Sequence, residues 1–237
     1  MRSRVWTAAA AAACAVACGG NAHGSSTESS DEPSLPAACS ALFGLPPSLL
    51  VDDFEDGDEL LDASVGLHGL WYVENDGTGR QSPPAGERAP RSLVAEPGAP
   101  NSDARALHTE ASGFRGWGAF VGVRLNAAVR ATCTVDASAS RGLSLWARGK
   151  GRVRVNFATP RTTPSGDGGD CSAPACSDFG AVVTLQDDWT RHELLFEELE
   201  QPDWADAADW EPTRLVRLSF WAEQGDLSLW LDDLRFF

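Results

Sequence analysis

Tryptophan, arginine and asparagine recur at alternate positions in several stretches of the chain, a pattern that suits sugar binding. The residues proposed to contact a ligand are Trp146, Arg154, Asn156, Arg217, Trp221 and Arg124. Indole rings stack on the apolar face of a pyranose, and arginine and asparagine hydrogen-bond its hydroxyl groups. The structural alternative is a set of Trp–Arg cation–π pairs on an ordinary solvent-facing sheet.

The elements that must position these side chains are strands, because hydrophobic residues alternate with period two. Gly142–Gly149 and Arg152–Ala158 are predicted to form a hairpin through the three-residue connection Gly149-Lys150-Gly151, which sets Trp146 opposite Arg154. Further strands are predicted at Leu70–Glu74, Ala106–Ala111, Ala119–Leu125, Ala181–Leu185, Thr190–Phe196, Leu215–Trp221 and Leu227–Phe236. About nine short strands separated by Gly, Pro and Asp turns predict an all-β fold, a two-sheet β-sandwich.

The remaining tryptophans fall into two predicted groups. Trp204 and Trp210, and Trp71 with Tyr72, are expected either to rim the site or to plug the ends of the sandwich. Two others, Trp189 and Trp230, are assigned to packing in the core or at the acidic end of the domain.

Acidic residues gather near both ends of the predicted sandwich, in the run DDFEDGD from Asp52 and at Asp232 and Asp233. Crowded carboxylates repel one another unless a cation or solvent intervenes, and calcium takes oxygen ligands from several segments. If the first and last strands are neighbours, Glu55 and Asp232 would converge on one Ca²⁺ ion. Otherwise the two runs are solvated acidic turns.

The motifs Asp-Phe-Glu-Asp-Gly, from Asp53, and Trp-Leu-Asp-Asp-Leu, from Trp230, resemble carbohydrate-binding modules of the galactose-binding-like jelly-roll superfamily. The stretch from Cys171 to Trp204 is similar to exported carbohydrate-binding-like domains of bacterial lipoproteins. The resemblance implies a jelly roll and a polysaccharide or oligosaccharide partner. It also implies a structural Ca²⁺ held by Glu55 and Asp232, with Asp53 as an additional ligand.

The N-terminal residues read as an export signal. Arg2 and Arg4 precede the apolar run Val5–Ala17, whose 13 residues are too short to span a bilayer. Cys18 follows small residues, as in a bacterial lipobox, which predicts lipid attachment; cleavage after Ala17 and free secretion is the alternative. The predicted domains are a signal peptide at 1–17, a lipidated cysteine and flexible linker at 18–48, and the sandwich at 49–237.

Export makes disulfides the expected state of the cysteines. Four remain if Cys18 carries lipid, and the spacing of Cys171 and Cys176 lacks the second pair that a zinc site needs. Cys171–Cys176 is predicted as a loop staple, which leaves Cys39 with Cys133. Four cysteines allow three connectivities.

Charge and motifs exclude several functions. A formal net charge of -15 repels nucleic acid, and any membrane contact is expected only through the N-terminal lipid. The sequence has no HExxH motif, nucleophile elbow or phosphate loop, so no catalytic residues are assigned. The prediction is therefore non-catalytic carbohydrate binding at a bacterial cell envelope. The alternatives are a structural or protein-interaction lipoprotein and, third, a glycan-active enzyme.

Overall fold

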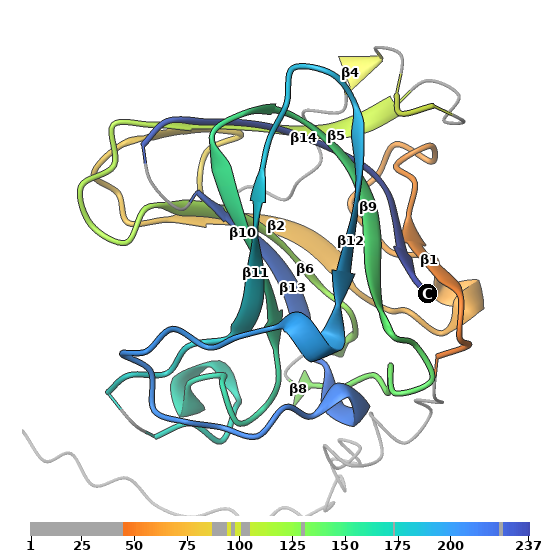
Figure 1. The fold of residues 1–237 in the computed structure, drawn as a ribbon, viewed down its shortest axis with the longest axis vertical. Helices are drawn as coiled ribbons and strands as arrows, with labels where there is room; N and C mark the ends of the chain where they lie inside the picture. The colour runs from red at the N-terminus through yellow and green to blue at the C-terminus, as the bar shows by residue number, and fades with distance from the viewer. Residues whose placement is uncertain are drawn as a thin grey trace, which may run out of the picture. The chain divides into compact units, whose positions relative to one another are not determined.

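The computed structural model describes residues 45–86, 94–95, 98–100, 105–128, 131–172, 174–222 and 225–237. These residues form two antiparallel β-sheets packed face to face, joined by loops and short 3-10 turns (Figure 1). The predicted signal peptide, Cys18, Cys39 and most of the predicted linker lie outside the described residues. Within the described part of the chain, no helix has the length and apolar character needed to cross a membrane.

The larger sheet has the strand order β12-β9-β14-β5-β3, with β1 also paired to β14 and β4 to β5. Its strands are β1 (Leu49–Asp52), β3 (Arg80–Ser82), β4 (Val94–Ala95), β5 (Arg105–Ser112), β9 (Gly142–Lys150), β12 (Thr190–Leu195) and β14 (Leu227–Phe236). The smaller sheet has the order β11-β10-β13-β6-β2. Its strands are β2 (Leu70–Asn75), β6 (Ala119–Arg124), β10 (Arg152–Ala158), β11 (Phe179–Thr184) and β13 (Arg217–Ala222).

Short elements complete the described part of the fold. The strands β7 (Ala127–Ala128) and β8 (Ala131–Thr132) pair only with each other. The 3-10 turns are η1 (Ala63–Val65), η2 (Ser165–Asp167), η3 (Phe196–Glu198) and η4 (Pro212–Arg214).

The core lies between the two sheets because alternate residues of each strand point inward. Leu145 on β9 and Val155 and Phe157 on β10 have no solvent exposure, and their sequence neighbours face outward. Burying one such side chain contributes about 1.5–3 kcal/mol. All nine predicted strands are present within two residues of their predicted bounds, so the predicted all-β sandwich is confirmed. The strands β1 and β3 are too short to show a period in sequence.

The predicted hairpin of β9 and β10 is wrong. β9 pairs with β12 and β14, whereas β10 pairs with β11 and β13, so the connection passes from one sheet to the other. Gly149 and Gly151 have positive φ at this crossing, and a Cβ on Gly149 would lie 1.9 Å from the Ser228 carbonyl oxygen. The strands were identified correctly because alternation is local, but their pairing partners are distant in sequence.

The prediction that the first and last strands are neighbours is confirmed. β1 pairs with β14 in the register Leu49–Phe236 and Asp52–Leu234. This pairing brings the two acidic runs to the same end of the larger sheet. The outer faces of the two sheets carry different sets of tryptophan and arginine side chains.

Candidate functional site

A groove of about 650 Å³ lies against the outer face of the smaller sheet. Its sheet side consists of outward-facing residues of β2, β6, β10 and β13, and loop residues between 162 and 204 form the opposite wall. Four of the six predicted ligand contacts line this groove: Arg154, Asn156, Arg217 and Trp221. Strand phase thus brought most of the predicted residues together on one face.

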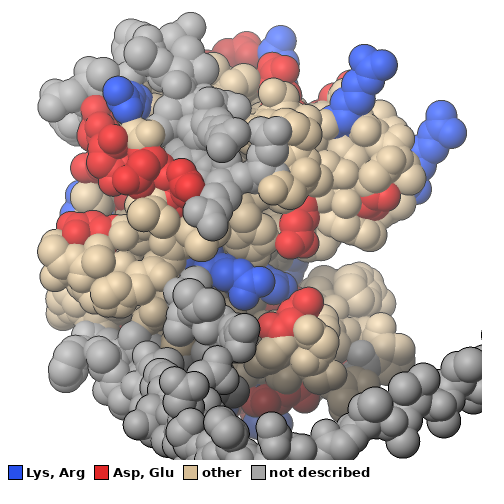
Figure 2. All heavy atoms as spheres, turned by 180° about the vertical axis from the view of Figure 1, so that it is seen from behind, with Lys and Arg blue, Asp and Glu red and all other residues tan. Residues whose placement is uncertain are grey.

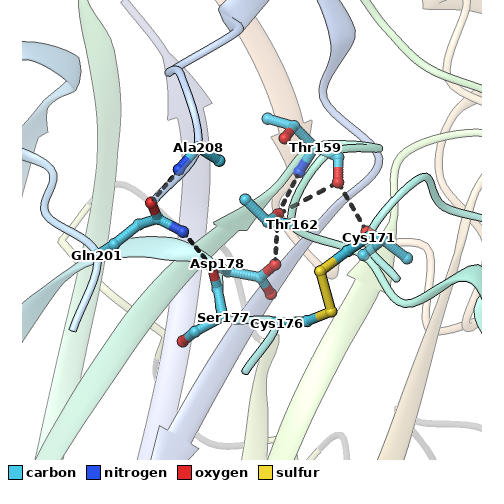
Figure 3. Close-up of a disulfide and its surroundings, with 9 residues drawn as sticks. Thr159, Thr162, Cys171, Cys176, Ser177, Asp178, Gln201 and Ala208 are labelled. Carbon is cyan, nitrogen blue, oxygen red and sulfur yellow. Dashed lines mark hydrogen bonds between the residues drawn. A yellow bond between two sulfur atoms is a disulfide. The ribbon is translucent and has the colours of Figure 1, made fainter. Parts of the chain in front are cut away.

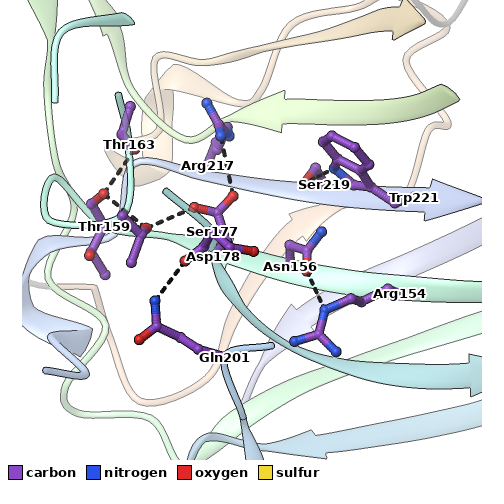
Figure 4. Close-up of polar contacts among 11 residues, drawn as sticks. Arg154, Asn156, Thr159, Thr163, Ser177, Asp178, Gln201, Arg217, Ser219 and Trp221 are labelled. Atoms are coloured by element: carbon purple, nitrogen blue, oxygen red, sulfur yellow. Dashed lines mark hydrogen bonds and ion pairs between the residues drawn. The ribbon is translucent and has the colours of Figure 1, made fainter. Parts of the chain in front are cut away.

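An aromatic cluster occupies the end of the groove next to β6. The Trp221 ring stacks on Phe120 with centroids 4.7 Å apart and an interplanar angle of 12°. Trp117 packs against Trp221 at 5.2 Å and leaves 49% of its surface exposed. The indole Nε1 of Trp221 donates to Ser219 Oγ at 2.9 Å, which fixes the ring orientation (Figure 4).

Trp117 lies on a glycine-containing loop that Asp76 holds in place. The Oδ2 atom of Asp76 accepts hydrogen bonds from the backbone N–H groups of Gly116 (2.9 Å) and Gly118 (2.8 Å). Its Oδ1 atom accepts from the backbone and hydroxyl of Thr78 at 2.9 and 2.6 Å. These bonds, the Thr78 hydroxyl first, lower the pKa of Asp76 to about 2. The carboxylate therefore stays charged and keeps the Trp117 loop ordered.

A fixed polar pair lies next to the aromatic cluster. Arg154 Nε donates to Asn156 Oδ1 at 3.0 Å (Figure 4). Arg154 Nη2 donates to the Glu200 carbonyl oxygen. Gly180 on the neighbouring strand leaves room for this pair, since a Cβ there would lie 2.6 Å from Asn156 Oδ1. The remaining donors of the asparagine amide are thus presented in one orientation.

An ion pair closes the other end of the groove. Asp178 is buried and accepts hydrogen bonds from Thr162 Oγ1 at 2.7 Å and from Arg217 Nη2 at 3.2 Å (Figure 4). Burial disfavours the charge on Arg217, but the attraction of Asp178 and other neighbours outweighs burial and raises the pKa of Arg217. The guanidinium is therefore neutralised by a protein partner.

The loop wall of the groove is tied together by a disulfide and an amide bridge. Cys171 and Cys176 are bonded, as predicted (Figure 3). Gln201 Nε2 donates to the Ser177 carbonyl at 2.7 Å, and Gln201 Oε1 accepts from Ala208 N at 2.8 Å. This bridge supports the segment that carries Trp204, whose side chain is 66% exposed at the groove.

Two predicted contacts lie elsewhere. Arg124 shares the outer face of the smaller sheet, but its guanidinium sits over the Tyr72 ring at 5.7 Å, outside the groove lining. Trp146 belongs to the larger sheet, where it pairs with Arg191 and Asp232 rather than with Arg154. The prediction for Trp146 is wrong because the predicted hairpin placed β9 and β10 in the same sheet.

Trp71 departs from its predicted place, because it is fully buried in the core. Trp210 packs against the core from its edge, which agrees with the predicted alternative of closing an end of the sandwich. Trp189 and Trp230 lie on the outer face of the larger sheet, so the predicted packing in the core is wrong. Arg148 lies between them, 5.1 Å from the Trp189 centroid and 4.6 Å from that of Trp230. Side chains alternate along β14, so Trp230 points outward because Leu229 and Leu231 on either side of it point into the core.

Sequence reasoning missed several groove residues. Trp117, Thr162 and Asp178 lie in loops, where strand phase gives no orientation. The one local signal was the stretch GFRGWG around Trp117, because closely spaced glycines around an aromatic residue indicate a tight loop that presents it.

At the end near β1 and β14, the three predicted calcium ligands accept hydrogen bonds from backbone N–H groups. Asp232 is fully buried and its Oδ2 accepts from Ala99 N at 2.8 Å, while Glu55 Oε1 accepts from Arg105 N at 3.1 Å. The Oδ1 atom of Asp53 accepts from the backbone N–H of Glu55 at 3.3 Å. Among the described residues, no group of three metal-binding side chains is close enough to hold an ion. Calcium therefore stays a prediction.

Cys133 is disulfide-bonded. Its predicted partner, Cys39, lies outside the described residues, so the pairing itself stays a prediction.

Comparison with known proteins identifies the fold. No family model and no curated protein matches the sequence. Among solved structures, the chain is similar to a family 11 carbohydrate-binding module of a cellulosomal cellulase of Clostridium thermocellum. The TM-score is 0.50 at 13% identity, covering 81% of this chain and 95% of the module.

Two weaker likenesses involve the same class of module. One is a Clostridium thermocellum family 11 module in complex with a β-1,3-1,4-mixed-linked tetrasaccharide, with a TM-score of 0.47 at 14% identity, covering 81% and 96% of the two chains. The other is a family 30 carbohydrate-binding module, with a TM-score of 0.45 at 14% identity, covering 70% of this chain and 91% of the module. The first likeness shows the fold, so the predicted resemblance to a jelly-roll carbohydrate-binding module is confirmed at that level.

Proposed function

We propose that this protein binds an oligosaccharide or polysaccharide in the groove of the smaller sheet without cleaving it. The observation that carries the proposal is the combination of exposed indoles with fixed polar groups. Trp117 and Trp204 offer apolar ring surface at the groove, and Asn156 offers an amide held by Arg154. Sugar rings need both, since their C–H faces stack on aromatic rings and their hydroxyls need oriented partners.

The arrangement of carboxylates supports binding over hydrolysis. Glycoside hydrolysis typically uses two carboxyl groups that flank the scissile bond, one of which gives up a proton. Three carboxylates line the groove: the buried one, Asp178, accepts hydrogen bonds from Thr162 and Arg217, and the other two, Glu74 and Asp167, are exposed. The fold likeness to a carbohydrate-binding module of a cellulase supports the same assignment.

The test is retention of the protein in native gels cast with a panel of polysaccharides. Trp204→Ala and Trp221→Ala should each weaken retention by a polymer that holds the wild type, by roughly tenfold, which is about 1.4 kcal/mol. Trp146→Ala is the matched control, because Trp146 is also a half-buried, outward-facing tryptophan but belongs to the other sheet. Equal losses in all three variants, or no loss at Trp204, would contradict the proposal.

We also propose that the protein is exported and anchored by lipid at Cys18. The bonded state of Cys171, Cys176 and Cys133 supports an oxidising compartment. Cys18→Ser should move the full-length protein from the membrane fraction to the soluble fraction of the expressing bacterium. Unchanged fractionation would argue for free secretion or for another mode of attachment.

For calcium, we propose a structural role at the β1–β14 end. Support comes from the pairing of β1 with β14, which brings the acidic run that contains Glu55 and the run that contains Asp232 to one end of the larger sheet. Millimolar Ca²⁺ should raise the melting temperature relative to chelator, and Glu55→Gln should abolish the difference. Identical melting curves in calcium and chelator would contradict this role.

A further inference from the structure

The groove carries more negative than positive side chains. Five charged residues line it: Glu74, Asp167, Asp178, Arg154 and Arg217. Three carboxylates against two guanidinium groups give a formal balance of -1. The whole chain adds a field of the same sign, with a net charge of -15, and Figure 2 shows acidic atoms gathered in patches on one face. An anionic polymer approaching the protein therefore meets repulsion.

Both guanidinium groups of the groove are already engaged by the protein. Arg217 is paired with the buried carboxylate of Asp178 at 3.2 Å. Arg154 donates to Asn156 and to the Glu200 carbonyl. The charge of Arg217 is thus neutralised within the protein, and an anionic sugar that displaced Asp178 from it would leave a buried carboxylate uncompensated.

Two exposed carboxylates come from different elements of the groove. Glu74 lies on β2 next to Phe120 of the aromatic cluster, in the register of the β2–β6 pair. Asp167 lies at the end of η2, on the loop wall. Its charge is among the causes that raise the pKa of Arg217, so its field extends into the groove. A bound acidic sugar would lie within the screening length of ~8–10 Å at physiological salt.

We propose that Glu74 and Asp167 act as a charge filter, so that the groove accepts uncharged sugars and rejects those that carry uronate or sulfate groups. The inference rests on the proposed glycan binding, and it assigns specificity to two residues that need not contact the sugar. Removal of both charges should tighten the binding of anionic polymer relative to that of neutral polymer.

The experiment is calorimetric titration of the full mature protein with matched polymer pairs. The pairs are hydroxyethyl-cellulose with carboxymethyl-cellulose, galactan with polygalacturonate, and dextran with dextran sulfate. We expect at least one neutral polymer to bind tenfold or more tightly than its anionic counterpart. The double variant Glu74→Gln/Asp167→Asn should reduce the ratio of the anionic-polymer Kd to the neutral-polymer Kd at least threefold. Raising the salt concentration should reduce the same ratio for wild type.

The matched control removes two charges from the outer face of the larger sheet. Glu110→Gln/Glu193→Gln changes the net charge equally, on β5 and β12, and should leave the ratio unchanged. Equal binding of neutral and anionic polymers, or a ratio that both double variants alter alike, would overturn the filter while leaving glycan binding intact. Binding of no polymer in any pair would overturn the proposed function and the filter together.

Discussion

The two outer faces of the sandwich use the same residue types to different ends. On the larger sheet, His108 stacks on Trp230 at 4.0 Å and 15°, and Arg148 lies over both Trp230 and Trp189. On the smaller sheet, Trp221 stacks on Phe120, but loops rise beside the sheet to form a groove. Tryptophan and arginine on a strand are therefore not sufficient to make a candidate site.

Access to ring faces separates the two surfaces. The ladder on the larger sheet is made of His108, Trp230, Arg148 and Trp189, and Trp230 has both a stacked histidine and a guanidinium as neighbours. The groove instead offers Trp117 and Trp204, which are 49% and 66% exposed. The loops make the difference, because they carry both exposed indoles and wall the groove.

The largest expected effect is on affinity, when the exposed indoles are removed. Trp117→Ala/Trp204→Ala should weaken binding of the retained polysaccharide by roughly a hundredfold, since two stacking surfaces of more than 1 kcal/mol each are lost. Trp230→Ala should leave affinity unchanged and lower the melting temperature, because its ring packs within the ladder. Calorimetry measures the affinity and circular dichroism measures the melting temperature. If the two variants lost affinity and melting temperature to the same extent, the proposed difference between the two faces would be wrong.

A smaller loss is expected when the support of Trp117 is removed. Asp76→Asn replaces one of the two acceptor oxygens by an NH2 group, which cannot accept from backbone N–H groups, so the Gly116–Gly118 turn loosens. Affinity should fall by about fivefold to tenfold. In the Trp117→Ala background the same change should have little further effect. Additive losses in this double-mutant cycle would show that Asp76 acts independently of Trp117.

The loop wall should contribute still less. Cys171→Ser/Cys176→Ser leaves the Gln201 bridge in place, so we expect about a threefold loss of affinity. The closed loop is short, and its loss should change the free energy of unfolding only modestly. Calorimetry on the variant and on oxidised wild type measures this loss. A loss as large as that of the double tryptophan variant would mean that the wall, rather than the indoles, dominates binding.

A buried aspartate, Asp52, makes the free energy of unfolding depend on pH. Asp52 is buried, and desolvation raises its pKa from 3.8 to about 7, although it accepts hydrogen bonds from Phe54 N and Trp71 Nε1. Between these values the folded protein holds a proton that the unfolded chain has lost. The free energy of unfolding therefore falls as pH rises from about 4 to 7 and levels off above.

The melting temperature of wild type should fall by a few degrees between pH 4.5 and 7.5, and Asp52→Asn should remove most of this fall. Asp62→Asn is the control, because Ser64 holds the pKa of this exposed residue below its ordinary value and it stays charged in the window. If both variants keep the wild-type slope, Asp52 does not cause it. Sugar affinity should not follow the Asp52 change, since Trp71 lies in the core between the sheets.

The sequence was informative about strands and faces and uninformative about pairing and loops. Arg154, Asn156, Arg217 and Trp221 could be placed on one surface because each strand alternates with the core residues around it. Trp146 could not be placed, because the register that excludes it involves β12 and β14, which lie more than 40 residues away. The position of Trp117 depends on Asp76, which lies in a different turn.

The most direct test of the account is to observe which tryptophans sense the sugar. In the ¹⁵N-labelled protein, indole N–H signals can be followed during titration with oligosaccharide fragments of the polymer that the gels retain. We predict shifts for Trp117, Trp204 and Trp221, with Trp146, Trp189 and Trp230 unchanged. Shifts confined to the larger-sheet tryptophans, or saturation with no indole shift at all, would contradict the assignment of the groove.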